Sequence, residues 1–380
     1  MIRLHHIALL ALLALPAALQ AQTKPVPTDQ QASGDQPADP GPLATLSPRL
    51  NHRDIQAAMR KVADWQLAHS QPKFNQQWTY AALYDGLIAA SRTTHDPTYA
   101  NAVQTFATTV DWKLLDARFP HADDQALGQS FLDLYQLHPD PIRLASTREI
   151  LTRLNTLQPD PNKPVWWWCD ALFMAPPVLV RLYAITHDRT YLDTLDRNWW
   201  ATSTLLYDPT NHLYFRDATF LQKHEQNGQP LFWSRGNGWV LAGLANVLEY
   251  MPADCPTRPR YVAQFREMAT RIASLQTSTG LWKTGLLDPD AYTMPEVSGT
   301  AFYTYALAWG INHGLLDPKV FHPVVERAWA GMLTHIYADG RLGNIQPIGA
   351  APGAFTPSSS YVFGVGGFLL AGSELDRIKH

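Results

Sequence analysis

The stretch His95-Asp96-Pro97-Thr98-Tyr99 is typical of a helix start, with Asp as the N-cap and Pro at the first helical position. The Asp-Pro pair returns at Asp140-Pro141 and Asp317-Pro318, and His187-Asp188-Arg189-Thr190-Tyr191 repeats the first stretch with Arg in place of Pro. Such starts recur about every 45–50 residues, a spacing that suits a helical hairpin. The repeat therefore predicts a chain built from pairs of helices.

Helical periodicity continues on both sides of these starts, as where Ile55, Met59 and Val62 step along one face. The periodic segments fall near residues 52–69, 77–92, 97–112, 124–137, 141–156, 169–186, 189–204, 234–250, 258–276, 297–313, 318–335 and 359–376. Taken in pairs they form six hairpins, so we predict an all-α fold, an (α/α)6 barrel with two concentric rings of helices.

One stretch, near residues 212–232, interrupts the helical pattern. Residues 212–220 alternate in polarity and are rich in aromatic side chains, which is typical of a short strand. Asn227-Gly228 then indicates a turn. We therefore expect a short β excursion at this point of the barrel.

The N-terminal part of the chain has the features of an exported protein. Residues 1–21 read as a signal peptide, with Arg3 before an apolar run and Leu19-Gln20-Ala21 as a cleavage site. Residues 22–47 are rich in Pro, Gln, Asp and Gly and are expected to be a disordered leader. Residues 48–380 then form a single catalytic domain in the periplasm or outside the cell.

The composition argues against several classes of function. Of the 380 residues 46% are apolar, enough for a large core, and the formal net charge is only −3. Because no basic block occurs, we expect neither nucleic acid nor a membrane as a partner. The His residues have no ligand-like spacing, so no metal site is expected. There is also no Gly-rich phosphate loop and no GxSxG motif of a serine hydrolase.

The only two cysteines are Cys169 and Cys255. Two Cys in an exported chain of this length are not a disulfide scaffold, so the core must hold the fold together. Whether they pair stays open from the sequence, although we expect Cys169 to be free and buried because tryptophans precede it.

Unusual residues gather at the start of every second helical segment. They are Trp78, Asp123-Asp124, Trp168 to Asp170, Trp233 to Trp239, Glu296 to Gly299 and Ser358 to Tyr361. If these segments form the inner ring, their N-termini meet at one mouth of the barrel. The positive ends of the helix dipoles then favour an anionic ligand there.

Two carboxylates in this set are candidates for acid/base chemistry. Asp170 follows Trp166-Trp167-Trp168-Cys169, and burial among indole rings should raise its pKa. Asp123 and Asp124 stand at a predicted helix start, which should lower their pKa values. A carboxyl with a raised pKa can act as the acid and one with a lowered pKa as the base. Each of these Asp residues can also be explained as a helix cap.

The stretch Trp233-Ser234-Arg235-Gly236-Asn237-Gly238-Trp239 places an Arg and two Trp at a helix start. Arg235 either holds a ligand carboxylate in a bidentate fork or braces the rim through an ion pair with Asp. Further cationic candidates are Arg216, Lys223 and His224, each of which is more typical of a surface than of a site.

These motifs resemble those of glycoside hydrolase family 105, the unsaturated rhamnogalacturonyl hydrolases, which are related to the family 88 unsaturated glucuronyl hydrolases. The resemblance covers about residues 50–376 and is carried by Trp168 to Met174 with Pro176, Trp233 to Trp239, His121 to Gln125, Glu296 to Ala301 and Tyr361 to Glu374. It implies an (α/α)6 barrel that uses no metal or organic cofactor. Its substrate would be an oligosaccharide, left by a polysaccharide lyase, with a 4,5-unsaturated uronic acid at the non-reducing end.

The resemblance also implies roles for particular residues. In this family an Asp delivers a proton to C4, water adds at C5, and the resulting hemiketal opens and releases the neighbouring sugar. That general acid/base corresponds to Asp170, and the second carboxylate to the Asp123-Asp124 pair, with Asp123 the better match. Trp233 and Arg235 correspond to substrate-contacting residues.

Further substrate contacts are predicted at Trp78, Asp124, Trp168, Arg216 and Trp239. Arg216 stands where some members carry His, so it either replaces that His in gripping the uronate or marks another linkage preference. Rhamnogalacturonan or another pectin is the predicted source of the substrate, while the leaving sugar and the oligomeric state stay open.

Two other readings of the same residues remain. In an ordinary inverting glycosidase the two Asp would act as acid and base on a saturated glycan. In a sugar-binding protein the Trp residues would hold a glycan without chemistry. A barrel whose site has decayed is a third reading, which the full set of motifs argues against.

Overall fold

The computed structural model describes residues 29–157, residue 160 and residues 163–379. The predicted signal peptide, residues 1–21, and residues 22–28 of the predicted leader lie outside this part of the chain. Within the described ranges no helix has both the length and the apolar character needed to cross a membrane.

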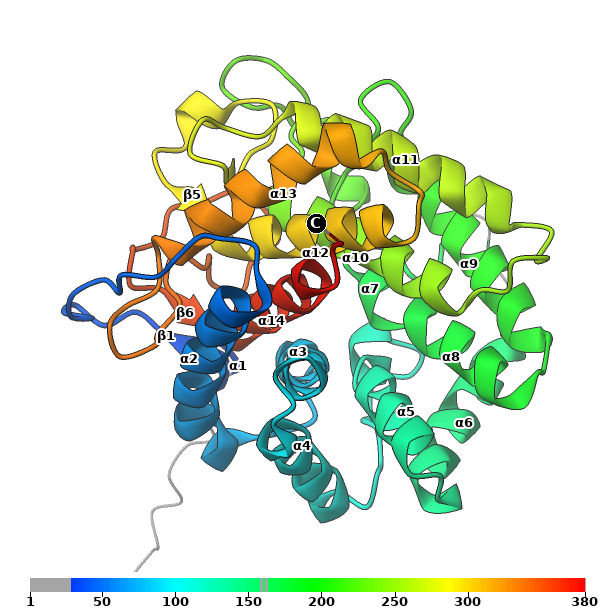
Figure 1. The fold of residues 1–380 in the computed structure, drawn as a ribbon. Helices are drawn as coiled ribbons and strands as arrows, with labels where there is room; N and C mark the ends of the chain where they lie inside the picture. The colour runs from blue at the N-terminus through cyan, green and yellow to red at the C-terminus, as the bar shows by residue number, and fades with distance from the viewer. Residues whose placement is uncertain (1–28, 158–159, 161–162, 380) are drawn as a thin grey trace, which may run out of the picture.

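Two concentric rings of helices build the molecule (Figure 1). The inner ring contains α3 (Trp78–Thr94), α5 (Gly128–Leu137), α7 (Ala171–Met174) with α8 (Pro176–Thr186), α10 (Ser234–Tyr250), α12 (Val297–Asn312) and α14 (Val362–Asp376). The outer ring contains α2 (His52–Ser70), α4 (Pro97–Thr109), α6 (Pro141–Asn155), α9 (Thr190–Leu206), α11 (Arg258–Ser274) and α13 (Pro318–Leu333). The predicted (α/α)6 barrel is confirmed, including which helices are inside.

Burial explains which helices line the interior. Nearly every side chain of α12 and α14 is buried, and such helices, apolar all round, are stable only when protein surrounds them. The outer helices are amphipathic, as in α2, where Ile55, Met59 and Val62 are buried and the opposite face is polar. Hence the two rings differ in sequence pattern as well as in position.

The predicted Asp caps start the outer helices. Asp96, Asp140 and Asp317 each accept a hydrogen bond from the backbone N–H two residues ahead, at 2.9–3.1 Å. These bonds satisfy N–H groups that the first helical turn leaves without partners. The repeat that predicted the hairpins therefore has a direct physical role.

Two predicted inner helices differ from the structure at their N-terminal ends. The segment 169–186 is divided into α7 and α8 at Pro176, because Pro lacks the N–H that a continuous helix needs. The segment 124–137 begins as a 3₁₀ turn at Ala122–Gln125, and α5 starts only at Gly128. Both irregular starts carry a candidate carboxylate.

The β structure is limited to short pairs in the described residues. β2 (Tyr207–Asp208) pairs with β3 (Leu213–Tyr214), and β4 (Trp282–Lys283) pairs with β5 (Pro295–Glu296). The predicted strand over 212–220 is thus only two residues long, and Ala218–Phe220 is a 3₁₀ turn. The predicted turn is present, with Gly228 at φ +83°.

Part of the predicted disordered leader is ordered. Residues 29–47 contain α1 (Asp29–Ser33) and β1 (Gly34–Asp35), which pairs with β6 (Ser360–Tyr361). Tyr80 donates a hydrogen bond to the carbonyl of Ala32 at 2.8 Å, and Asp35 forms an ion pair with Arg341. The prediction rested on composition, which does not register such specific contacts.

Helix α14 closes the inner ring by packing between α12 and α3. The contact with α3 requires glycine at Gly366, because a Cβ there would lie 2.0 Å from the carbonyl oxygen of Ala82. His52 at the start of α2 contacts Asp376 at the end of α14, with 3.0 Å between Nδ1 and Oδ1. The ring is therefore sealed by segments from the two ends of the described chain.

Candidate active site

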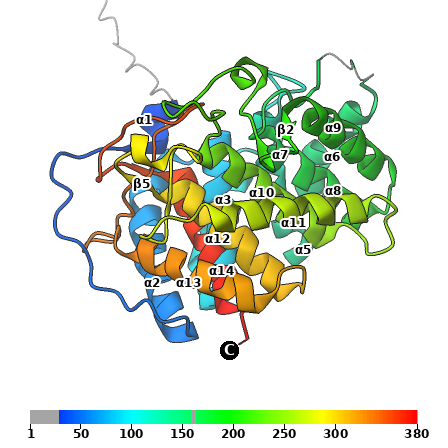
Figure 2. The same cartoon turned by 90° about the horizontal axis from the view of Figure 1, so that it is seen from above.

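The candidate residues meet at the N-terminal ends of the inner helices. Trp78 begins α3, Asp170 precedes α7, Arg235 lies in the first turn of α10, and Glu296 caps α12. In Figure 2 this end is marked by α1, β2 and β5, opposite the C-terminus. The predicted mouth is therefore present, with helix N-termini around it.

Asp170 is held in place from the β2–β3 region. The backbone N–H of Cys169 donates to the carbonyl of Arg216 at 2.8 Å, and Trp168 forms a β-bridge with Asp217. These bonds bring the Arg216 guanidinium next to the carboxyl of Asp170, with 3.6 Å between Nε and Oδ2. The Cys169 thiol donates to the same oxygen at 3.5 Å.

Burial raises the pKa of Asp170, as predicted, and the positive charges of Arg216 and Arg235 oppose this rise. The carboxyl of Asp170 therefore keeps its proton to a higher pH than an exposed Asp does. Once the proton has left, the two guanidinium charges stabilise the carboxylate. An acid in this setting can give up a proton near neutral pH.

Asp123 is the second carboxyl of the site. It lies in the 3₁₀ turn before α5, with its Oδ2 3.6 Å from Nδ1 of His121 and 4.0 Å from Nη1 of Arg118. Burial raises its pKa to about 7, Arg118 opposes the rise, and the negative charge of Asp170 adds to it. The predicted fall in its pKa is wrong, because desolvation outweighs the weak dipole of a single turn.

Asp124 has a different environment from its neighbour. Its carboxylate is buried and forms an ion pair with the guanidinium of Arg118, whose Nε lies 3.0 Å away, and it also accepts the Arg118 backbone N–H at 3.1 Å. These bonds anchor the loop that carries Asp123. The structure thus assigns Asp124 to the support of this loop through Arg118.

Arg235 is buried and largely occupied by the protein itself. Its Nη1 and Nη2 donate to the carbonyls of Gln346 and Pro347 at 2.6 and 2.7 Å, and the guanidinium lies 4.5 Å from the ring of Trp233. Burial lowers its pKa to about 10. Its Nε is buried and has no hydrogen-bond partner in the described part of the chain, so Arg235 acts on the mouth mainly through its charge.

Arg216 is the more accessible cation beside the acid. Its Nη1 donates to Asp217 at 2.6 Å, whereas its buried Nε has no hydrogen-bond partner among the described residues. That Nε lies 3.6 Å from Oδ2 of Asp170, so it faces the acid. The Arg216 side chain is 20% exposed, so its positive charge can also act on an anionic ligand at the mouth.

A tryptophan that sequence reasoning did not select lies at the same place. Trp167 is 45% exposed, its ring is 4.7 Å from that of Trp168, and the guanidinium of Arg216 lies 5.5 Å from its centroid. Trp168 also contacts the ring of His121 at 4.5 Å. An exposed indole next to the acid is a signal that only the structure provides, because three adjacent Trp are equivalent in sequence.

The remaining predicted contacts lie deeper. Trp239 is fully buried in the barrel core, with its ring 4.1 Å from that of Phe302. Trp78 is half-buried and stacks on Phe363 at 5.5 Å. The structure therefore places Trp239 within the packing below the mouth rather than on its surface.

Both cysteines are free and buried, so the expectation for Cys169 is confirmed. In the ranges that the structure describes, no group of three or more His, Cys, Asp or Glu side chains could hold a metal ion. The ionisable groups at the mouth are instead carboxyls and guanidiniums, with the imidazole of His121 beside Asp123.

Comparison with known proteins agrees with this geometry. The model of Glycosyl Hydrolase Family 88 matches residues 52–379. An unsaturated 3S-rhamnoglycuronyl hydrolase from Formosa agariphila is 41% identical, over 87% of this chain and 92% of that protein. A family 88 glycosyl hydrolase from Bacteroides vulgatus is 33% identical, with a TM-score of 0.82 over 86% of this chain and all of that one.

A possible family 105 member from Salmonella enterica shares the fold, with a TM-score of 0.71 at 19% identity over 90% of this chain and 96% of that one. The inferred relation to families 105 and 88 is thus confirmed at the level of fold and of family model. This chain is a hydrolase that belongs to glycosyl hydrolase family 88.

Proposed function

We propose that this hydrolase removes a 4,5-unsaturated uronic acid from a rhamnose residue by hydrating the C4–C5 double bond. The observation that carries the proposal is the buried Asp170 and the half-buried Asp123, both with raised pKa, near the positive charges of Arg216 and Arg235. A proton donor effective near neutral pH is what protonation of a vinyl ether requires.

The reaction assigns a task to each group at the mouth. Protonated Asp170 gives its proton to C4, and the positive charge that develops at C5 is shared with the ring oxygen. Water then adds at C5, and one carboxylate of the pair takes up its proton. The hemiketal opens, so the uronic acid leaves as a keto acid and the neighbouring sugar regains its hydroxyl.

The substrate carboxylate suits the cationic side of the mouth. The positive charges of Arg216 and Arg235 and the inner-helix N-termini favour an anion there. Uronate binding beside Arg216 would direct C4 toward Asp170, because the two side chains are 3.6 Å apart.

The rhamnose part of the proposal rests on relatives. The hydrolase from Formosa agariphila is named for unsaturated 3S-rhamnoglycuronyl substrates, and a second relative of the same name, from Alteromonas, is 31% identical. Rhamnoglycuronyl oligosaccharides are therefore the first substrates to test. The rhamnogalacturonan type predicted from the motifs is the second.

The test follows the ultraviolet absorbance of the C4–C5 double bond in both kinds of unsaturated oligosaccharide. We expect absorbance to fall with the wild-type protein and to persist with Asp170→Asn. Cleavage of a saturated glycan, with no loss of absorbance on any unsaturated one, would replace the proposal by an ordinary inverting glycosidase. Binding without either reaction would instead indicate a sugar-binding protein.

A further inference from the structure

The N-terminal segment of the described chain runs along the mouth of the barrel. In Figure 2, α1 lies at the same end as the N-termini of the inner helices. The match to the family model begins at residue 52, so this segment precedes the matched range. We name residues 32–36 the strap, because they connect the starts of two inner helices, α3 and α14.

The strap is fixed to both of these helices. In the first turn of α3, Tyr80 donates a hydrogen bond to the carbonyl of Ala32 at 2.8 Å. Before α14, β1 pairs antiparallel with β6 and places Gly34 opposite Tyr361. Ser33, between these two contacts, is fully buried. The strap is therefore packed into the barrel rather than lying loosely on its surface.

The pairing of β1 with β6 requires glycine at position 34. A Cβ there would lie 2.6 Å from Cγ of Tyr361 and closer still to the carbonyl oxygen of Ser360. The ring of Tyr361 thus lies directly against the backbone of the strap, and Tyr361 is only 3% exposed. Any side chain at position 34 would push this ring away.

Tyr361 leads to Arg235 through one further ring. The rings of Tyr361 and Phe363 are stacked, with 5.7 Å between their centroids. The guanidinium of Arg235 lies 4.8 Å from the centroid of Phe363. Its positive charge also acts on the hydroxyl of Tyr361, where it opposes the rise in pKa that burial causes. The strap, the two rings and the guanidinium therefore contact one another in series.

The strap also contacts the loop that supplies the carbonyl partners of Arg235. The hydroxyl of Thr356 in this loop donates to the side-chain carbonyl of Gln36 at 3.2 Å. The same loop begins with Gln346 and Pro347, whose carbonyls accept the hydrogen bonds of Arg235. Arg235 is thus held from two sides, and the strap contacts both.

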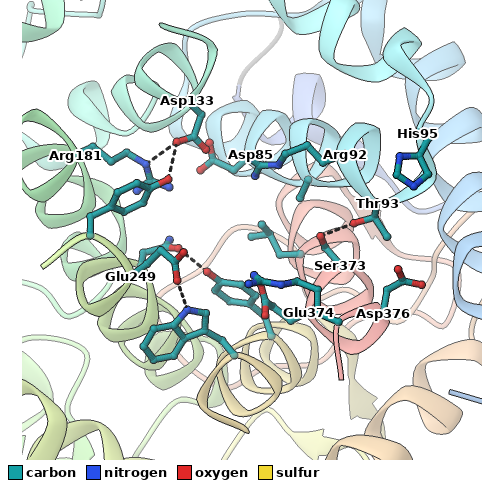
Figure 3. A pocket seen from close by; sticks show the side chains of 17 residues that line it. Asp85, Arg92, Thr93, His95, Asp133, Arg181, Glu249, Ser373, Glu374 and Asp376 are labelled. Atoms are coloured by element: carbon teal, nitrogen blue, oxygen red, sulfur yellow. Dashed lines mark hydrogen bonds and ion pairs between the residues drawn. The ribbon is translucent and has the colours of Figure 1, made fainter. Parts of the chain in front are cut away.

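The two ends of α14 are held differently. At its C-terminal end the hydroxyls of Ser373 and Thr93 share a hydrogen bond of 2.6 Å, drawn in Figure 3. Asn312 of α12 also donates to the carbonyl of Glu374 at 2.9 Å. At the N-terminal end no side chain of the described residues caps the helix, and β6 is instead paired with β1. The start of α14 is therefore held through backbone pairing with the strap.

We propose that the strap is a positioning element of the mouth, which through Tyr361 and Phe363 keeps the Arg235 guanidinium where its charge attracts the substrate carboxylate. The inference rests on the proposed function for the identity of that carboxylate. Because the attraction between charges falls with distance, displacing the guanidinium should weaken substrate binding before it affects the proton donor.

The test compares Gly34→Val with Ala38→Val, which adds the same kind of bulk at an exposed position after the strap. Both are assayed on an unsaturated rhamnoglycuronyl disaccharide, well below the Tm of either variant. Gly34→Val should raise KM about three- to tenfold and change kcat less than about twofold, because it displaces Tyr361 and, through it, Arg235. Ala38→Val should match the wild type.

The division between KM and kcat separates positioning from a loss of stability. A variant that was only destabilised would contain fewer active molecules, so its apparent kcat would fall while its KM stayed the same. An unchanged KM in Gly34→Val, a loss confined to kcat, or an equal rise of KM in Ala38→Val would each overturn the proposal.

Hydrogen–deuterium exchange tests the same contacts without reference to activity. In Gly34→Val the amides of residues 345–361 should exchange faster than in the wild type, whereas those of α9 should not change. Unchanged exchange over 345–361 would overturn the proposal. If the wild type consumes no unsaturated uronide, the proposed function fails, and the exchange result alone decides whether the strap holds this region in place.

Discussion

The two ends of the inner ring hold the same kinds of side chain but leave opposite atoms without partners. At the mouth, the buried Nε atoms of Arg216 and Arg235 have no hydrogen-bond partner among the described residues. At the other end, Arg181 donates from Nε to Asp133 and from Nη1 to Pro177, and the buried atom without a partner is an acceptor, Oδ2 of Asp85. The pairing of each buried charge, and not only its presence, therefore distinguishes the two ends.

Helix direction gives this contrast a common cause. All inner helices point the same way, so their N–H ends gather at the mouth and their C=O ends gather at the opposite end of the inner ring. A barrel of parallel inner helices therefore has one end suited to anions and one suited to cations. Side chains then strengthen or cancel that difference.

The largest effect is expected from removing the proton donor at the mouth. Asp170→Asn should lower kcat for an unsaturated uronide by about a thousandfold, because general acid catalysis is lost. The Tm of the variant should stay close to that of the wild type. A large loss of Tm would show that the variant disturbs the whole barrel, and retained activity would remove Asp170 from the mechanism.

Exchanging the guanidinium beside the acid tests the anion preference of the mouth. Arg216→Met should reduce kcat/KM about ten- to a hundredfold, mainly through KM, because the uronate loses a charge-assisted hydrogen bond. Arg92→Met removes a guanidinium at the opposite end and is the matched control, with activity expected within twofold of wild type. Equal losses in both variants would mean that overall charge, not position, controls binding.

Trp167 tests whether the exposed indole at the mouth contributes to substrate binding. Trp167→Ala should raise KM about three- to tenfold with little change in kcat, because a stacking surface for the sugar is lost. Trp167→Phe should restore most of the affinity. An unchanged KM in the Ala variant would leave this ring without a part in recognition.

The smallest effect concerns stability and involves both ends. Asp123 and Asp85 each have a pKa raised to about 7, so the folded protein keeps protons between about pH 4 and 7 that the unfolded chain has released. The free energy of unfolding should therefore fall as pH rises through this range. Asp123→Asn or Asp85→Asn should each reduce the fall in Tm between pH 5 and 8 by about 2 °C.

Thermal melts of the two variants can separate the ends. If Asp123→Asn alone flattens the pH dependence, the buried carboxyl of the mouth carries the effect; if Asp85→Asn alone does so, the other end carries it. A wild-type Tm that rises from pH 5 to 8 would contradict the expected sign for both.

The sequence contains enough local information to predict the barrel, because several outer helices begin at a cap that acts within a few residues. Asp96 and Asp140 cap helices through their own neighbours, so their role is visible without tertiary structure. Pro176 likewise ends a helix locally, although the apolar run around it suggested one continuous helix. Residues 29–36 were mispredicted because their partners lie in segments distant in the sequence.

The site was predictable as a set of residues but not as a set of environments. Asp123 and Asp124 are adjacent, yet the charge of Asp170 acts on one and the other holds Arg118, a difference that depends on the path of a single 3₁₀ turn. The same limit applies to Trp167 and Trp239, whose exposure depends on packing between segments.

Closure of the ring by α14 has a consequence for how the chain folds. The contacts that seal the barrel join residues such as Gln56 and Asp376, which are 320 positions apart. Closing so long a loop has a high entropic cost, and proteins dominated by such contacts fold slowly. Until α14 is in place, the apolar sides of α3 and α12 that it covers are exposed, and surfaces of this kind are prone to aggregate.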